Sequence, residues 1–316
     1  MPLNQNQFLK YLQKNFSPKQ KILIAISCGI DSTVLYDLIN KSQFFDLKNI
    51  FYIFFDHQKR VEGKYEIEKF INYYELNKKN TFIKKLKLGK KETSFQNKAR
   101  TTRYQYILKL SKLLGTDEVF FGHHLDDLKE SYFLRKIQSS NVLGLSNVFN
   151  EKFEKLNIHR PLVKYSKKQI KAYAEKNKLI WFEDRSNFEL DYTRNKVRSY
   201  LSSNSKISQS IKKNMSNYQD IKYLVNFYSS YFERLSKKRF EIKAQDFKHL
   251  NKTLQTIVVQ SFYYSLRLSL KKQPRNENIN NFVDVVIGSN HKFRVKKSVF
   301  GGKIGFFGKK LCLNLT

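Results

Sequence analysis

Residues 22–32 read ILIAISCGIDS, and this stretch decides the fold of the first part of the chain. Its first five residues are an uninterrupted apolar run, which is typical of a strand buried on both faces. The small residues Ser27 and Gly29 then favour a tight turn. Apolar residues follow at helical spacing, namely Val34, Leu35, Leu38 and Ile39. The stretch therefore predicts a strand, a tight turn and a helix in succession.

The same alternation continues along the chain. Further strands are expected at 50–55, 81–88 and 118–122, and helices at 99–114, from 125 to about 137, and at 167–177. Residues 180–184 fit either a short edge strand or a loop. Strands that alternate with helices at this spacing indicate βαβ units and a parallel sheet. We therefore predict an α/β fold whose functional groups gather at the carboxyl ends of the strands.

A second domain is expected after residue 205. The serine-rich stretch 202–209 resembles a linker, so we predict domains at 1–204 and 205–316. Periodic patterns predict helices at about 211–235 and 254–268, and the tail 292–315 alternates like strands about a Gly301-Gly302 turn. We expect a smaller, mainly helical, basic domain with a short terminal β-hairpin. It carries 22 Lys and Arg against 6 Asp and Glu.

The charge of the whole chain points to a polyanionic partner. Sixty Lys and Arg stand against 27 Asp and Glu, a net charge of +33. An AT-rich coding bias could raise Lys without a functional cause, but it would not remove carboxylates. Nucleic acid is therefore the favoured partner, because phosphate contacts by Lys and Arg supply most sequence-independent affinity.

Cysteine content and hydropathy indicate the compartment. The two cysteines, Cys28 and Cys312, exclude a disulfide framework and a four-thiolate metal site. The uninterrupted apolar runs fall short of the roughly 20 residues that a membrane span needs. The first 21 residues show no signal-peptide pattern. We expect a cytoplasmic protein with no membrane partner.

The turn after the first strand is a candidate phosphate cradle. Its Ser27, Gly29 and Ser32 leave backbone N–H groups free to face a phosphate, and the following helix start adds partial positive charge. Asp31 makes sense there if it holds a Mg²⁺ ion that bridges phosphates. The Walker A pattern is absent. The alternative is an ordinary strand-to-helix turn in which Ser or Asp caps the helix.

A second polar cluster opens the helix after the fourth strand. It reads His123-His124-x-Asp126-Asp127, followed by Glu130 and Ser131. Acidic residues are common in a first helical turn because they interact with the helix dipole. A pair of histidines before them is less usual and indicates a site. A zinc site competes, but no third and fourth ligand stands at a suitable spacing.

Six segments between residues 22 and 198 together carry a resemblance to one family. The loop Ser27 to Ser32 resembles the SGGxDS loop of the N-type ATP pyrophosphatases, the PP-loop superfamily. The others resemble motifs of the tRNA(Ile)-lysidine synthetase family: 56–60 (DHGLR), 99–104 (ARxxRY), 123–131 (HHxDDxxET), 160–162 (RPL), and 181–198 (EDxSN and RNxxR). The additional C-terminal domain of longer family members is not expected in this chain.

Two departures from the family pattern stand out. Cys28 takes the place of a glycine, which is tolerable provided that its φ stays negative, and we interpret it as a substitution rather than a nucleophile. The family's Gly-rich RGxGxxGL segment is here Gln138 to Leu145 and keeps only its last Gly-Leu.

The resemblance implies a ligase. In the family reaction, ATP adenylates C2–O of the wobble cytidine of tRNA(Ile) with a CAU anticodon. Free L-lysine then attacks C2, giving lysidine, AMP and pyrophosphate. ATP and Mg²⁺ are the implied cofactors, with Asp31 as metal ligand. The tRNA and lysine are the implied partners, and a homodimer stays open.

The implied site residues fall into three groups. The catalytic candidates are Asp31, Arg103, Asp126, Asp127 and His124. We expect Arg103 to stabilise the transferring phosphate or the activated base, Asp126 and Asp127 to contact metal or ammonium, and His124 or His57 to accept a proton. The ATP-binding candidates are Ala25, Ser27, Cys28, Gly29, Ile30, Asp31, Ser32, Asp56 and His57. The candidates for tRNA or lysine binding are Arg100, Arg160, Glu183, Asp184, Asn187, Arg194, Asn195 and Arg198.

Some alternatives stay open. An ordinary helix-surface arginine is the less favoured interpretation of Arg103. The charges of 183–198 fit a structural ion-pair lattice as well as they fit the entrance for tRNA or lysine. Another PP-loop tRNA-modifying enzyme is the first functional alternative, although tRNA thiolation generally needs more cysteines. The second is a non-catalytic tRNA-binding derivative, which the altered Gly-rich segment would favour.

Overall fold

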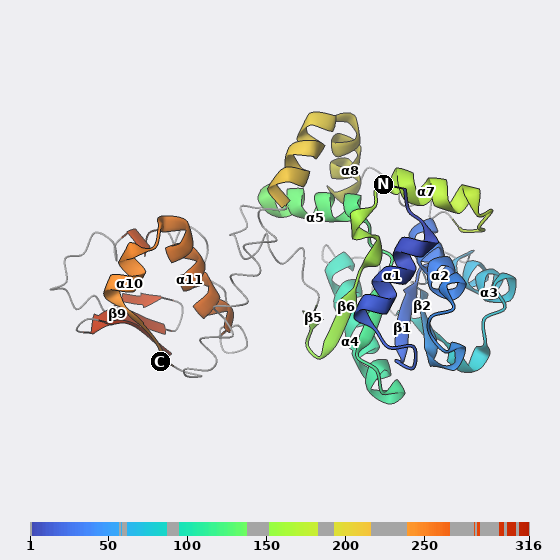
Figure 1. The fold of residues 1–316 in the computed structure, drawn as a ribbon, viewed down its shortest axis with the longest axis horizontal. Helices are drawn as coiled ribbons and strands as arrows, with labels where there is room; N and C mark the ends of the chain where they lie inside the picture. Colours follow the sequence, from blue (N-terminus) through green and yellow to red (C-terminus); the bar gives the residue numbers. More distant parts are fainter. Residues whose placement is uncertain are drawn as a thin grey trace. The chain divides into compact units, whose positions relative to one another are not determined.

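The computed structural model describes residues 2–56, 58, 62–86, 95–137, 152–182, 193–215, 239–265, 281, 283–284, 297–299, 302–307 and 310–315. The chain divides into two compact units (Figure 1). One comprises residues 1–130 and 150–196, and the other comprises 131–149 and 197–316. The predicted domain boundary near residue 205 stays a prediction.

The first unit contains a six-stranded sheet in the order β3-β2-β1-β4-β6-β5. The first five of these strands run parallel, and β5 pairs antiparallel with β6. The strands are β1 (Ile22–Ile26), β2 (Ile50–Asp56), β3 (Thr81–Lys85), β4 (Glu118–Phe121), β5 (Lys152–Phe153) and β6 (Leu156–His159). The parallel α/β fold predicted from the sequence is confirmed.

Helices flank this sheet. They are α1 (Gln5–Asn15), α2 (Ile30–Ser42), α3 (Glu62–Tyr73), α4 (Phe95–Leu114) and α7 (Lys167–Lys176). Helix α5 (Leu125–Ile137) begins in this unit, and its residues from 131 onward belong to the second unit. Short 3₁₀ turns lie at Leu47–Asn49, Lys78–Asn80 and Pro161–Lys164. Residues 180–182 form a loop rather than a strand. No helix among the described residues has the length and hydropathy that crossing a membrane requires.

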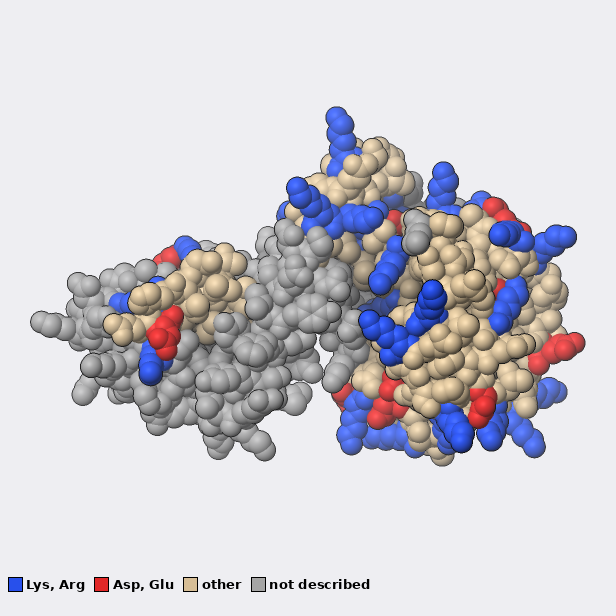
Figure 2. Space-filling view, in the orientation of Figure 1, with Lys and Arg blue, Asp and Glu red and all other residues tan. Residues whose placement is uncertain are grey.

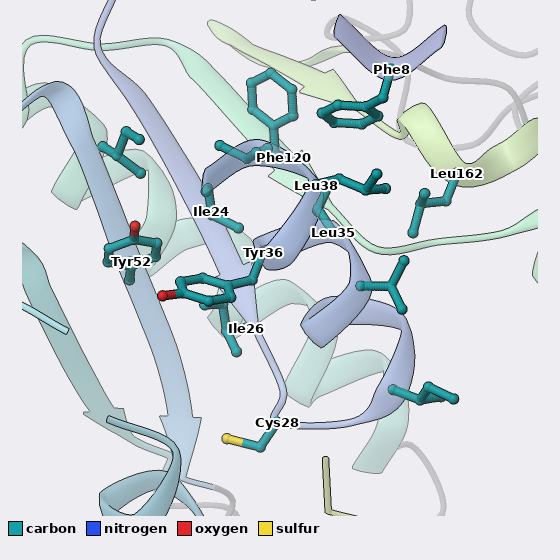
Figure 3. Close-up of a cluster of buried hydrophobic side chains, with 14 of the residues drawn as sticks. Phe8, Ile24, Ile26, Cys28, Leu35, Tyr36, Leu38, Tyr52, Phe120 and Leu162 are labelled. Atoms are coloured by element: carbon teal, nitrogen blue, oxygen red, sulfur yellow. The ribbon is translucent and has the colours of Figure 1, made fainter. Parts of the chain in front are cut away.

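The core of this unit lies on both faces of the sheet, because successive strand residues point to opposite sides. Ile22, Ile24 and Ile26 of β1 belong to one buried cluster, shown in Figure 3 with side chains of α2. Leu23 belongs to a second cluster, with Ile107 of α4. Burying one such side chain stabilises the fold by about 1.5–3 kcal/mol. The uninterrupted apolar run of β1 therefore reflects burial on both faces.

The strand order creates a switch point beside β1. The chain passes from β1 to β2 and β3 on one side, and β4 then pairs with the other side of β1. Ile24 lies opposite Tyr52 of β2 and also opposite Phe120 of β4. The turns that follow β1 and β4 are therefore neighbours at the carboxyl edge of the sheet. Open α/β sheets form their ligand crevice at this edge.

The second unit contains an antiparallel sheet in the order β7-β10-β9-β8. Its strands are β7 (Arg239–Lys243), β8 (Lys297–Val299), β9 (Gly302–Phe307) and β10 (Lys310–Leu315), and its helices include α10 (Ala244–His249) and α11 (Lys252–Ser265). Val299 lies opposite Gly302, which agrees with the predicted turn at that point. The sheet is larger than the expected hairpin. Residues 216–238 lie outside the described residues, so the mainly helical character stays a prediction.

The linker-like stretch 202–209 is helical on both sides of Asn204. Helix α8 (Thr193–Ser203) ends there, and residues 205–215 are helical again. The hydroxyl groups of Ser202 and Ser203 donate to the Ser199 carbonyl oxygen at 2.7 and 3.1 Å. These local bonds satisfy the serine side chains inside a helix. The stretch is therefore helical rather than irregular, and the domain boundary placed near it stays a prediction.

Candidate active site

The turn after β1 is held by its own hydroxyl groups. Ser32 Oγ donates to the Gly29 carbonyl oxygen at 2.9 Å and lies 3.1 Å from both the Ser27 backbone nitrogen and Ser27 Oγ. Gly29 is the N-cap of α2, with an extended φ of −77°. The predicted strand, turn and helix are thus all present, and Asp31 lies in the first turn of α2.

Cys28 does not have the negative φ that would make its side chain tolerable. Its φ is +60°, in the left-handed region that favours glycine. The side chain is buried, as Figure 3 shows at the end of β1, and burial raises the pKa of its thiol well above the usual value. A buried thiol that resists ionisation makes a poor nucleophile. The interpretation of Cys28 as a substitution is therefore favoured, but it carries backbone strain.

This strain predicts that a glycine variant at position 28 is more stable than an alanine variant, the reverse of the usual order. Both Cys28→Gly and Cys28→Ala remove the thiol group. Only Cys28→Gly also removes the Cβ atom and with it the backbone strain. We expect the glycine variant to be the more stable by about 0.5–1 kcal/mol, the left-handed penalty less the entropy cost of glycine. Urea unfolding of both variants checks this. A more stable alanine variant would show that the turn relaxes to a negative φ.

Gly122 allows the end of β4 to approach the start of α2. A Cβ atom at this position would lie 2.9 Å from the carbonyl carbon and oxygen of Asp31 and from the backbone nitrogen of Ser32. These neighbours are backbone atoms and cannot swing away. Only glycine therefore fits here without moving the turn that follows β1.

Three carboxylates surround the buried side chain of His124. Its Nε2 lies 3.4 Å from Asp127 Oδ2 and 3.7 Å from Asp31 Oδ1, and its Nδ1 lies 4.0 Å from Asp126 Oδ2. The structure thus brings together the four residues that were predicted from separate motifs.

Helix capping explains how α5 places this group. His124 precedes α5, and its Nδ1 accepts a hydrogen bond from the Asp126 backbone N–H at 3.2 Å. Asp127 Oδ2 in turn accepts from the His124 backbone N–H at 3.0 Å. This reciprocal pattern resembles a capping box, but the His124 side chain bonds the second residue of the helix instead of the third. Because Nδ1 is an acceptor, the ring proton lies on Nε2, which faces Asp127 and Asp31.

The donor set suits a cation that also has other ligands. Within the described ranges, no group of three His, Cys, Asp or Glu side chains is placed to hold a metal ion by itself. Mg²⁺ at nucleotide sites uses one or two carboxylates, with phosphate and water oxygens completing its shell. Asp31 with Asp127 fits that requirement. Sequence reasoning missed the cations nearby: Lys129 Nζ lies 3.2 Å from Asp126 Oδ1, and Lys167 contacts Asp31.

An aromatic and cationic group lies around His123. Arg160 Nε donates to His123 Nδ1 at 3.2 Å. The His123 ring stacks on Phe121 and Phe121 stacks on Tyr104, with ring centroids 5.5 and 5.6 Å apart. The guanidinium carbon of Arg100 lies 5.1 Å from the centre of the Tyr104 ring. The sequence indicated both arginines but not the ladder between them.

Partial burial and the nearby arginines favour the neutral form of His123. Desolvation is the main cause that lowers its pKa to about 3, and the positive charges of Arg160, Arg100 and Arg103 lower it further. Arg103 is half-buried on α4, close enough to act on this ring. The neutral ring, with Nδ1 occupied, presents an N–H donor at Nε2.

The depressed pKa of His123 predicts a pH-dependent loss of stability. The unfolded chain takes up this proton near pH 6.5, whereas the folded chain does so only near pH 3. Stability from this group is therefore complete above pH 6.5 and falls by up to about 1.4 kcal/mol per pH unit below it. His123→Gln removes this titration. We therefore expect its free energy of unfolding to fall less steeply between pH 6.5 and 4, by up to about 1.4 kcal/mol per pH unit. An unchanged slope in chemical denaturation would contradict a His123 that stays neutral in the folded chain.

Other predicted residues fall at or outside the edge of this site. Ala25 lies in β1 opposite Ile53 of β2 and Phe121 of β4. Asp56 ends β2, is buried, and accepts from the Gln58 N–H at 2.8 Å. Arg198 is exposed on α8 and belongs to the second unit. The following predicted residues lie outside the described residues or side chains: His57, Gln138 to Leu145, Glu183, Asp184, Asn187, Arg194 and Asn195.

Curated relatives agree with the family resemblance. The tRNA(Ile)-lysidine synthase of Thermosipho africanus is 31% identical over 182 residues, which are 56% of this chain and 42% of that protein. The synthase of a Wolbachia endosymbiont of Brugia malayi is 33% identical over 57% of this chain and 43% of its own. That of Staphylococcus aureus strain COL is 29% identical over 78% of this chain and 61% of its own. The chain thus spans about half the length of these relatives.

A solved structure supports the fold. The U34-tRNA thiolase NcsA of Methanococcus maripaludis, solved with its [4Fe-4S] cluster, matches with a TM-score of 0.54 and 17% identity. The match covers 67% of this chain and 78% of that one. At this identity the likeness concerns the fold alone. The PP-loop domain family, for its part, matches residues 2–204. With its Ser27–Ser32 turn at the switch point beside β1, the chain belongs to the PP-loop domain family.

Proposed function

We propose that this chain ligates L-lysine to C2 of the wobble cytidine of a tRNA(Ile) with a CAU anticodon, at the expense of ATP. The observation that carries this proposal is the meeting of Asp31 with His124 and Asp127 where β1 and β4 end. The PP-loop family match supports ATP use. The relatives named tRNA(Ile)-lysidine synthase support the tRNA substrate and the ligase activity.

The proposed reaction has two steps. The C2 carbonyl oxygen of the cytosine attacks the α-phosphorus of ATP, and pyrophosphate leaves. The ε-amine of lysine then attacks C2, AMP departs with that oxygen, and lysidine remains. In both steps the protein contributes mainly by positioning and by stabilising charge.

The described residues suit these steps. The start of α2 after the Ser27–Ser32 turn suits a phosphate, because the first N–H groups of a helix lack partners within the helix and the helix dipole favours negative charge there. Mg²⁺ held by Asp31 would neutralise charge on the pyrophosphate oxygens. Arg103 adds positive charge beside His123. His124 Nε2 lies 3.4 Å from Asp127 Oδ2, and Nδ1 accepts from the Asp126 N–H, so the predicted role of His124 as proton acceptor would require the bond at Nδ1 to break.

The basic residues of 205–316 would bind the tRNA backbone in the cytoplasm. The first unit adds further basic side chains: on its visible face, Figure 2 shows Lys and Arg over several elements, with fewer Asp and Glu. Electrostatic contacts of this kind release counterions, so tRNA affinity should fall steeply with salt. A homodimer stays open.

The test is an incubation of the purified chain with ATP, Mg²⁺, radiolabelled lysine and a CAU-anticodon tRNA(Ile) transcript. Label in the tRNA supports the ligase. Release of pyrophosphate that depends on tRNA, without label, would favour another PP-loop tRNA-modifying enzyme. Tight tRNA binding with neither product would favour the non-catalytic derivative.

A further inference from the structure

Lys167 binds both carboxylate oxygens of Asp31. Its Nζ lies 2.7 Å from Oδ1 and 2.8 Å from Oδ2, although the two residues are 136 positions apart in the chain. The family motifs in the sequence do not include Lys167, and no step of the proposed reaction uses it. The contact matters because Asp31 is the residue proposed to hold the metal ion.

Three sets of hydrogen bonds hold the backbone around Lys167 in place. Ser166 and Gln169 form a capping box that defines where α7 begins. The Lys167 N–H donates to Asp126 Oδ2 at 2.8 Å. The preceding Tyr165 carbonyl oxygen accepts from the Leu125 N–H at 2.9 Å. The start of α7 is therefore bonded to the start of α5, and the Lys167 ammonium is tethered within reach of Asp31.

We propose that Lys167 is the built-in counter-cation of Asp31, which a divalent cation displaces when it binds with the nucleotide. This inference rests on the proposed function, because it takes Asp31 as the metal ligand. An ammonium that engages both oxygens uses a lone pair on each and places a positive charge beside the oxygens that Mg²⁺ would bind. Two cations on one carboxylate also repel each other.

The role differs from that of an ordinary surface ion pair. The carboxylates of Asp31, Asp126 and Asp127 converge on one histidine and would repel one another without cations beside them. Lys167 reduces that repulsion while the site lacks metal. When the divalent cation arrives, the ammonium is released next to the nucleotide, and its exposed side chain leaves it room to move. Lys167 is thus a positioning residue that sets how much divalent cation the site requires.

The test compares Lys167→Met with Lys171→Met. Lys171 lies one turn further along α7, is exposed and pairs with Glu175 at 3.8 Å, so its variant removes the same charge from the same helix. The probe is Mn²⁺ with a non-hydrolysable ATP analogue, and water proton relaxation reports protein-bound Mn²⁺. We expect the Mn²⁺ dissociation constant to fall about fivefold in Lys167→Met, the worth of a good partly exposed ion pair, and to stay unchanged in Lys171→Met.

Two further variants keep the test decisive. Lys167→Arg keeps the cation and should bind Mn²⁺ as the original chain does, and Asp31→Asn should lose the bound Mn²⁺. An unchanged or weaker Mn²⁺ affinity in a folded Lys167→Met protein would overturn the inference. If the original chain bound no Mn²⁺ with the analogue, the proposed ATP chemistry itself would fail. The two failures are therefore distinguishable.

Discussion

Replacing Asp31 with alanine should reduce pyrophosphate release and lysine incorporation by about 10²–10³-fold or more, the usual cost of removing one electrostatic group that stabilises a transition state. Asp31 is the carboxylate on which the turn after β1, the His124 group and Lys167 converge. Its loss removes the proposed metal ligand and leaves the ammonium of Lys167 without its partner. The measurement is the lysine-incorporation assay under saturating ATP.

The fold should survive this change. Asp31 lies in the first turn of α2, where an acidic residue stabilises a helix by about 0.3–1 kcal/mol. A matched control is Asp46→Ala, which removes an exposed carboxylate just before β2, away from the carboxyl edge of the sheet. That variant should keep full activity. Near-normal activity in Asp31→Ala would refute the assignment of Asp31 as metal ligand.

Replacing Gly122 with alanine should impair both stability and nucleotide binding. The added methyl group would lie 2.9 Å from backbone atoms of Asp31 and Ser32, so the start of α2 must move. Overpacking of this kind costs about 1–3 kcal/mol. Because the moved segment is the proposed phosphate cradle, we expect ATP affinity to fall about tenfold or more, equivalent to 1.4 kcal/mol. Urea unfolding and calorimetric titration with ATP measure the two effects.

Gly63 provides the matched control for this prediction. It lies in α3, and a Cβ atom built there meets nothing within 4 Å. Gly63→Ala should therefore stabilise the chain slightly, by about 0.5–1 kcal/mol, as alanine replaces glycine in a helix. Equal stability and ATP affinity in the Gly122 and Gly63 variants would show that β4 and α2 can separate without loss.

Local sequence patterns predicted the fold of the first unit well. The apolar run of β1 has no polar residue because clusters on both faces of the sheet bury it, and helices cover those faces. Helices α1 and α3 and strands β5 and β6 were not anticipated. The burial of Phe8 and Leu12 in α1 depends on packing against distant segments, which a short window of sequence does not contain.

The candidate site was predictable only as separate motifs. Asp31 and the His124-Asp126-Asp127 group each follow a strand, so a parallel sheet brings them to one edge. The contact from Lys167 depends instead on where the start of α7 docks. The need for glycine at position 122 likewise arises from a neighbour 90 residues earlier in the chain, and no local pattern reports that approach.

The backbone of Cys28 was the clearest disagreement within the loop. The cysteine in place of a family glycine was expected to be tolerable only if its φ stayed negative. The structure keeps the left-handed conformation and buries the thiol instead. The contacts of the turn hold this backbone conformation. One of them is the hydrogen bond that the Phe182 N–H donates to the Cys28 carbonyl oxygen at 3.0 Å.

The central position of β1 has a consequence for synthesis of the chain. One edge of β1 pairs with β2, but the other pairs with β4, about one hundred residues later, with Leu23 opposite Val119. On a ribosome that adds about 5–20 residues per second, this second edge stays uncovered for several seconds or longer. An apolar strand with an open edge is a template for association with other chains. Nascent chains should therefore need a chaperone most between the emergence of β1 and that of β4.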